Sequence, residues 1–171
     1  EKDLKILPHS FNHQDLIDGR TDVITAYSID EPFFFRQRRF RYLEFTPRAA
    51  GIDFYGDNLF TSEREVQRHA ARARAFREAS LRGWRHAMQH PEETADLIRA
   101  RYTTDYSREH LLFMARQMEA LLQPDMIELG YMYPGRWRHI ADTYAGLGML
   151  PHEFPLDGFL YDRPVRVDPR V

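Results

Sequence analysis

The segment "DVITAYSIDEPFFF", from Asp22 to Phe35, is the basis for the predicted fold of the first third of the chain. Its first half is rich in β-branched and aromatic residues, which favour a buried strand. Its second half begins with two acidic residues and has Pro32 in the first helical turn, where a missing N–H costs nothing. The segment therefore predicts a strand that leads directly into a helix, with Asp30 as the helix cap.

Two further strands are predicted on either side of this segment. Residues 4–7 ("LKIL") precede it and residues 41–45 ("RYLEF") follow it, and a short helix is expected over residues 13–18. Strands and helices then alternate, which is the pattern of a parallel α/β sheet. We therefore expect residues 1–56 to form an α/β lobe.

The composition changes after residue 56, and the rest of the chain is predicted to be mostly helical. Ser62 and Glu65 form an S-x-x-E capping box, which predicts a helix that runs to about Gln89. Further helices are expected to begin at Pro91, after Ser107 and at Pro134. Residues 57–161 are thus expected to be a helical part, and residues 162–171 a Pro-rich tail or linker.

The composition of the 171 residues excludes several classes of function. The net charge is −2, so no overall field attracts nucleic acid, and no apolar run approaches the roughly 20 residues that cross a bilayer. Cysteine is absent, which excludes thiolate metal sites, cysteine nucleophiles and disulfides. The hydrophobic fraction of 43% and the charged fraction of 29% are typical of a globular protein.

A cluster of polar groups occupies the junction between the predicted strand and helix: Tyr27, Ser28, Asp30 and Glu31. In open α/β sheets, ligands bind beyond the carboxyl ends of the strands, which is where this cluster falls. A carboxylate there can accept hydrogen bonds from an amine or amidine, and a tyrosine ring can cover an apolar face. The alternative is structural, with Asp30 capping the helix and Glu31 in solvent.

A second cluster lies in the segment "GIDFYGDNLF", residues 51–60, where the α/β part gives way to the helical part. Junctions between domains are frequent ligand sites, so Tyr55, Asp57 and Asn58 are candidate binding residues. The alternative is a connector in which the aspartate and asparagine side chains bond to their own backbone. The sequence leaves both interpretations open.

Neither catalysis nor metal binding is predicted. Two H-x-x-x-H pairs exist, His9 with His13 and His86 with His90, but both fall at expected helix ends and no third ligand is evident. The arginine-rich residues 64–85 are interpreted as a solvated helix face. No phosphate-binding glycine loop, nucleophile elbow or nucleophile–base pair is present, so we expect a protein that is not an enzyme and uses no cofactor.

Three segments resemble the ABC-transporter substrate-binding proteins of the thiamine-pyrimidine and sulfonate type. They are "GRTDVITAYSIDEPF" (19–33), "GIDFYGDNLFTSE" (51–63) and "RAFREASLRGWRHAMQHPEETADLI" (74–98). The resemblance covers nearly the whole chain, and Val23 departs from the usual alanine. It implies a type II periplasmic-binding-protein-like fold, in which two α/β lobes hold a small molecule between them.

Two more segments resemble a narrower branch of that family. They are "YMYPGRWRHIADTYAGLGML" (131–150) and "GFLYD" (158–162). In this branch the module is the extracytoplasmic sensor of membrane signalling proteins, such as diguanylate cyclases and histidine kinases. The resemblance therefore implies a periplasmic location, and a C-terminal tail that leads to a membrane segment of the parent protein.

The resemblance also implies which residues meet the ligand. Glu31 would be a polar contact to the ring nitrogens or amino group of the ligand, which is an aminopyrimidine or a sulfonate. Tyr27 would line the pocket, while Tyr55, Asp57 and Asn58 would lie at the cleft by the hinge. The fungal synthases related to this family carry a cysteine-rich segment that this chain lacks, so no synthase activity is inferred.

The same resemblance implies a partial fold. The chain would begin inside the second lobe and then supply the helical remainder of the first, so the pocket would be incomplete. The helices would then expose an apolar surface that favours a homodimer. We expect a sensor domain that works by ligand-induced lobe closure. The alternatives are a substrate-binding component of an ABC transporter and, in another class, a non-binding oligomerisation scaffold.

Overall fold

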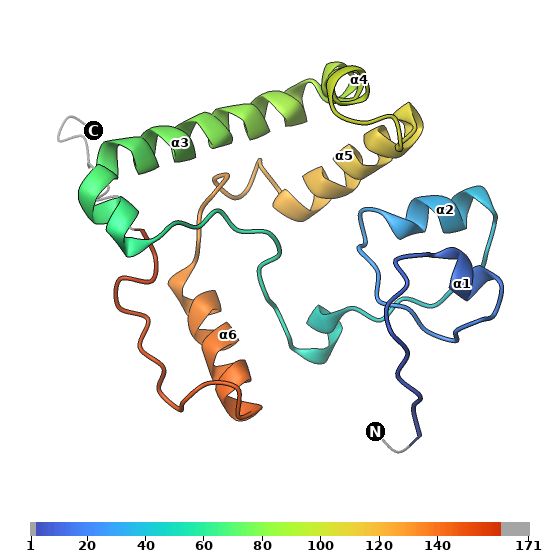
Figure 1. The fold of residues 1–171 in the computed structure, drawn as a ribbon, viewed down its shortest axis with the longest axis horizontal. Coiled ribbons are helices and arrows are strands. Elements are labelled where there is room, and N and C mark those ends of the chain that lie inside the picture. Colours follow the sequence, from blue (N-terminus) through green and yellow to red (C-terminus); the bar gives the residue numbers. More distant parts are fainter. Residues whose placement is uncertain (1–2, 162–171) are drawn as a thin grey trace. The chain divides into compact units, whose positions relative to one another are not determined.

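The computed structural model describes residues 3–161, and this part of the chain is helical, with no strand (Figure 1). The helices are α1 (Gln14–Ile17), α2 (Glu31–Gln37), α3 (Glu63–Gln89), α4 (Pro91–Arg101), α5 (Arg108–Leu122) and α6 (Pro134–Gly146), with a 3₁₀ turn, η1, at Pro47–Ala50. No helix among the described residues combines the length and the apolar character that a membrane span requires.

The prediction of an α/β fold is wrong for the described residues. The three segments expected as strands, residues 4–7, 22–27 and 41–45, are irregular and make no backbone ladder there. Most of their apolar side chains lie in solvent: Val23 is 73% exposed and Leu43 is 84% exposed. The preference of such residues for strands comes largely from packing against neighbours on a sheet, and these segments have no such neighbours. The partial two-lobed α/β architecture is therefore not observed.

The predicted helices are confirmed, because their signals are local. Ser107 precedes α5 in an extended conformation, and its hydroxyl accepts a hydrogen bond from the His110 N–H at 3.1 Å. Helices α4 and α6 begin at Pro91 and Pro134, in the turn where proline is tolerated. Helix α3 covers the predicted span but is broken at His69, whose φ of −137° and ψ of 42° are not helical.

The described residues form two compact units. The first unit comprises the chain up to Leu43 together with Arg64–Leu129, and the second comprises Glu44–Glu63 together with the chain from Gly130 onward. The division predicted from the sequence, after residue 56, refers to the lobes of a larger fold and stays a prediction. The predicted tail, residues 162–171, lies outside the described residues.

The core of the first unit is aromatic and lies between α2 and α5. Phe35, His110 and Phe113 are buried, and the Phe33 and Phe113 ring centroids are 5.6 Å apart. The guanidinium of Arg36 lies 5.1 Å from the centroid of the Phe113 ring, within the range of a cation–π contact. Helix α4 packs against α5 and contributes a buried alanine, Ala95. The N-terminal end of α2 is thus held on the α4–α5 pair.

The second unit is built around α6. Ala141 and Ala145 are buried on this helix, and the Tyr144 ring lies 5.4 Å from the ring of Phe54. Turn η1 precedes Phe54 in the chain and ends at Gly51. The φ of Gly51 is 79°, the left-handed conformation that glycine adopts without strain. Asp53, Phe54 and Tyr55 therefore contact α6.

Candidate functional site

The first group of predicted site residues forms a closed turn at the start of α2. The Tyr27 N–H donates to Glu31 Oε2 at 2.7 Å, and the Asp30 N–H donates to the Tyr27 carbonyl at 3.0 Å. Tyr27 is 73% exposed, so its side chain is accessible to a solute. A carboxylate has about four acceptor positions, so the bond from Tyr27 leaves Glu31 able to accept further hydrogen bonds.

Asp30 is the N-cap residue of α2, as predicted, but its side chain makes no capping hydrogen bond. Its φ of −120° and ψ of −79° place it at the helix start, but its carboxylate accepts no hydrogen bond from the first turn. Instead, Asp30 Oδ1 lies 2.7 Å from Nε2 of His110. The contact is close but poorly aligned for a hydrogen bond, and neither atom has another partner among the described residues. The Asp30 carboxylate therefore lies beside the buried imidazole of His110 and not at the N–H groups of the first turn of α2.

His110 is a residue that the sequence reasoning missed. It is only 2% exposed, and its ring stacks on Phe33 with a centroid distance of 4.4 Å and an interplanar angle of 7°. The rings of Phe34 and Tyr106 flank it at 4.8 and 5.1 Å. The only sequence signal is a histidine in the first turn of a capped helix, and nothing local relates it to Asp30.

A second histidine, His13, packs against the same helix. Its ring stacks on Phe34 with a centroid distance of 4.0 Å. Burial lowers the pKa of His13 below its ordinary value of 6.5, and the positive charge of Arg38 adds to this effect. The carboxylates of Glu31 and Asp30 oppose the shift. The start of α2 therefore lies among several titratable groups, with the neutral form of His13 favoured.

In the second unit, Tyr55 is tied to the start of α6. Its hydroxyl accepts a hydrogen bond from the Tyr133 N–H at 2.7 Å, and its ring lies 5.3 Å from that of Trp137. The guanidinium of Arg136 sits 4.6 Å from the Tyr55 ring centroid and forms a 3.0 Å ion pair with Asp53. These contacts give Tyr55 a structural role within its unit.

The other two candidates in the second unit behave differently from each other. The Asn58 side chain donates to the Gly56 carbonyl at 2.7 Å, as the turn interpretation expects. Asp57 is exposed, so its carboxylate faces solvent. The structure therefore groups Tyr55, Asp57 and Asn58 on one short segment, while Tyr27 and Glu31 belong to the first unit. Their roles as ligand contacts stay predictions.

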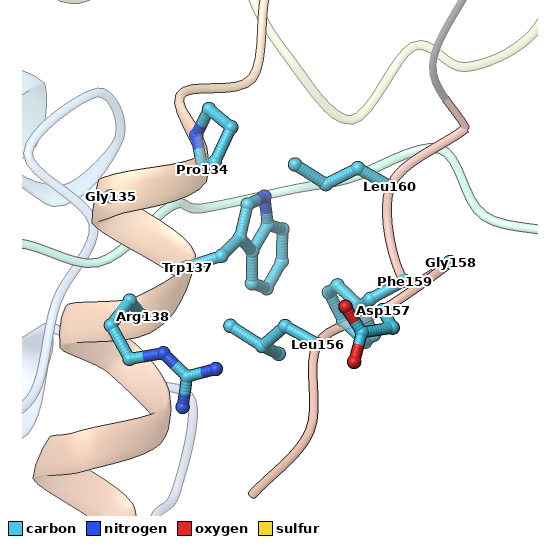
Figure 2. A pocket seen from close by; sticks show the side chains of 9 residues that line it. All are labelled: Pro134, Gly135, Trp137, Arg138, Leu156, Asp157, Gly158, Phe159 and Leu160. Carbon is cyan, nitrogen blue, oxygen red and sulfur yellow. The ribbon is translucent and has the colours of Figure 1, made fainter. Parts of the chain in front are cut away.

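The second unit also contains a hollow of about 470 Å³ that the sequence did not indicate. Figure 2 shows the indole of Trp137 close to the Leu156 and Phe159 side chains, and all three line the hollow. The Trp137 and Phe159 rings meet edge to face at 4.8 Å, and Nη1 of Arg138 donates to the Phe154 carbonyl at 2.8 Å. Small-molecule pockets have volumes of roughly 300–1,000 Å³, so this hollow is large enough for a small solute.

The described residues contain no group of three or more histidine, aspartate or glutamate side chains arranged to hold a metal ion. His86 and His90 do lie side by side, with ring centroids 4.5 Å apart, and Glu93 is 3.7 Å from His86. This pair marks the junction of α3 and α4.

Comparison with known proteins identifies the class as a family of small-molecule-binding proteins that are normally extracytoplasmic. The family model described as NMT1/THI5 like matches residues 1–94, which is more than half of the chain. The chain belongs to the NMT1/THI5-like family. The match confirms the resemblance to thiamine-pyrimidine and sulfonate binding proteins, and it spans both groups of predicted site residues. No curated protein and no solved structure matches the chain.

Proposed function

We propose that this chain is the small-molecule-binding sensor domain of a bacterial membrane signalling protein. The family match supports a solute-binding role, and the resemblance of residues 131–150 and 158–162 to the sensor branch supports the narrower assignment. The domain would lie in the periplasm as part of a membrane-anchored protein and would perform no catalysis itself.

The observation that carries the proposal is the geometry of the Tyr27–Glu31 turn. A half-buried carboxylate, fixed by the Tyr27 N–H at 2.7 Å, lies four residues from an exposed aromatic ring. The remaining acceptor positions of Glu31 suit the paired N–H donors of an aminopyrimidine or amidine, while the ring of Tyr27 suits its flat face. A sulfonate would instead require N–H donors, so the turn favours the aminopyrimidine class.

The signalling step would be a change in the population of two conformations. A ligand that binds one conformation more tightly shifts the equilibrium toward it by the difference between the two binding free energies. Tyr55, Asp57 and Asn58, in the second unit, are kept as proposed ligand contacts. The lobe closure that the family resemblance implies would be transmitted through the C-terminal tail to the membrane.

A thermal-shift measurement on the full-length protein tests the proposal. A solute present at a hundred times its dissociation constant stabilises its site by about 2.7 kcal/mol, which raises the midpoint by roughly 5–10 °C for a domain of this size. We expect such a shift with an aminopyrimidine and its loss in Glu31→Gln. Glu44→Gln, a change at an exposed carboxylate, is the matched control and should retain the shift. Absence of a shift with aminopyrimidines and sulfonates at millimolar concentration contradicts the proposal.

The same family match also favours a second candidate, a substrate-binding component of an ABC transporter. Ligand binding cannot separate the two, because both predict it. The sequence of the full-length protein after Val171 separates the two candidates. A membrane segment followed by an output domain supports the sensor, and a stop codon directly after this domain supports the transporter component.

A further inference from the structure

We propose that His110 is a positioning residue that holds the Tyr27–Glu31 turn in its closed form through Asp30. This inference rests on the proposed function only for the importance of the turn. The contact itself belongs to the ligand-free protein and can be measured there.

The contact begins on a well-fixed helix. His110 lies in the first turn of α5, and its own N–H donates to the Ser107 hydroxyl that caps the helix. Two ion pairs join Arg108, two residues before His110, to α4: one to Asp96 at 2.7 Å and one to Glu92 at 3.1 Å. The imidazole therefore projects from a helix pair that is held both by packing and by charge.

The contact continues into the turn through Asp30. The Asp30 carboxylate meets His110 Nε2 at 2.7 Å, while its main chain makes two bonds of the turn and the helix. Its N–H donates to the Tyr27 carbonyl at 3.0 Å, and its carbonyl accepts from the Phe33 N–H at 3.0 Å. Fixing the Asp30 side chain thus fixes the backbone on both sides of it, including the N–H of Tyr27 that reaches Glu31.

Position 110 requires a side chain that stacks on Phe33 and also has a polar atom for Asp30, and an imidazole provides both. Phenylalanine would stack on Phe33 as well as histidine does, but it offers nothing to Asp30. The buried oxygen of Asp30, Oδ1, would then face an apolar ring, which is costly, so the carboxylate would turn back toward the N–H groups of the first turn of α2. That rotation would bring a second carboxylate beside Glu31. Titratable groups near the contact are Tyr106, whose ring lies 5.1 Å from that of His110, and His13, whose pKa is affected by the charges of Asp30 and His110.

Amide hydrogen exchange of the whole chain, measured residue by residue by NMR without ligand, tests the inference. We expect His110→Phe to speed exchange of the Tyr27 N–H by about tenfold, since the turn then loses the close polar contact to Asp30, and a polar contact to a carboxylate contributes on that scale. Exchange within α4 should change little. His110→Gln, whose amide can reach Asp30 from the position of Nε2, should restore most of the protection.

The matched control is His139→Phe, which replaces an exposed histidine on α6 and should leave Tyr27 exchange unchanged. An equal rise at all amides of the first unit would show a packing role alone and would overturn the inference, as would unchanged exchange at Tyr27. If His110→Phe does not fold, Asp30→Asn takes its place, and the same selective rise at Tyr27 is required. Failure of the proposed function appears separately, as the absence of a ligand-induced thermal shift in the unmodified protein.

Discussion

Removal of the Tyr55 hydroxyl tests whether the segment of residues 53–58 is held on α6. In Tyr55→Phe the Tyr133 N–H loses its acceptor, while the ring keeps its contacts with Arg136 and Trp137. A neutral hydrogen bond contributes about 1 kcal/mol net, so the free energy of unfolding of the second unit should fall by that amount. Tyr55→Ala also loses the cation–π and ring–ring contacts, which together contribute about 1–2 kcal/mol more.

The assay can be restricted to the second unit because the chain has two tryptophans, one in each unit. In a Trp84→Phe background, Trp137 becomes the single indole, and its ring lies 5.3 Å from Tyr55. For a unit of this size the urea dependence is about 1 kcal/mol per molar, so Tyr55→Phe should lower the unfolding midpoint by about 1 M.

Tyr131→Phe provides the matched control, since Tyr131 is 56% exposed in the same unit and should leave the midpoint unchanged. The reasoning is refuted if Tyr55→Phe behaves like the control, because the hydroxyl would then hold nothing. It is also refuted if Tyr55→Phe is as destabilising as Tyr55→Ala, because the ring contacts would then contribute nothing.

Three further predictions concern the first unit. Ser107→Ala removes the cap of α5 and should lower the free energy of unfolding by about 1 kcal/mol, while Ser107→Asp, which keeps an acceptor, should lower it much less in urea titrations. The lowered pKa of His13 means that the unfolded chain binds a proton more readily than the folded one. Stability should therefore fall as the pH drops below about 6.5, and His13→Phe should flatten this dependence in unfolding curves at pH 7.5 and 5.5. Arg108→Gln removes two exposed ion pairs, so its effect on the melting temperature should be small in low salt and vanish at 1 M salt; an effect that persists there contradicts a purely electrostatic contact.

The sequence by itself determined the helices and the local turns. Ser107 and the prolines at positions 91 and 134 act within one turn of their own position, so their effect does not depend on the rest of the chain. The bond from Asn58 to the Gly56 carbonyl is equally local. The family could be predicted for a similar reason, because it rests on the order of residues in short segments.

The tertiary structure decided everything that depends on a distant partner. The β-branched segments found no neighbouring strand within the described residues, and their backbone therefore stayed irregular. Tyr55 accepts a hydrogen bond from Tyr133, which is 78 positions away in the sequence. The Asp30 side chain contacts a histidine on another helix and makes no bond to the first turn of its own helix. A side chain binds whichever complementary group folding brings nearest. The chemistry of Asp30 was therefore readable from the sequence, but its choice between a helix end and the imidazole of His110 was made by the packing of α2 on α5.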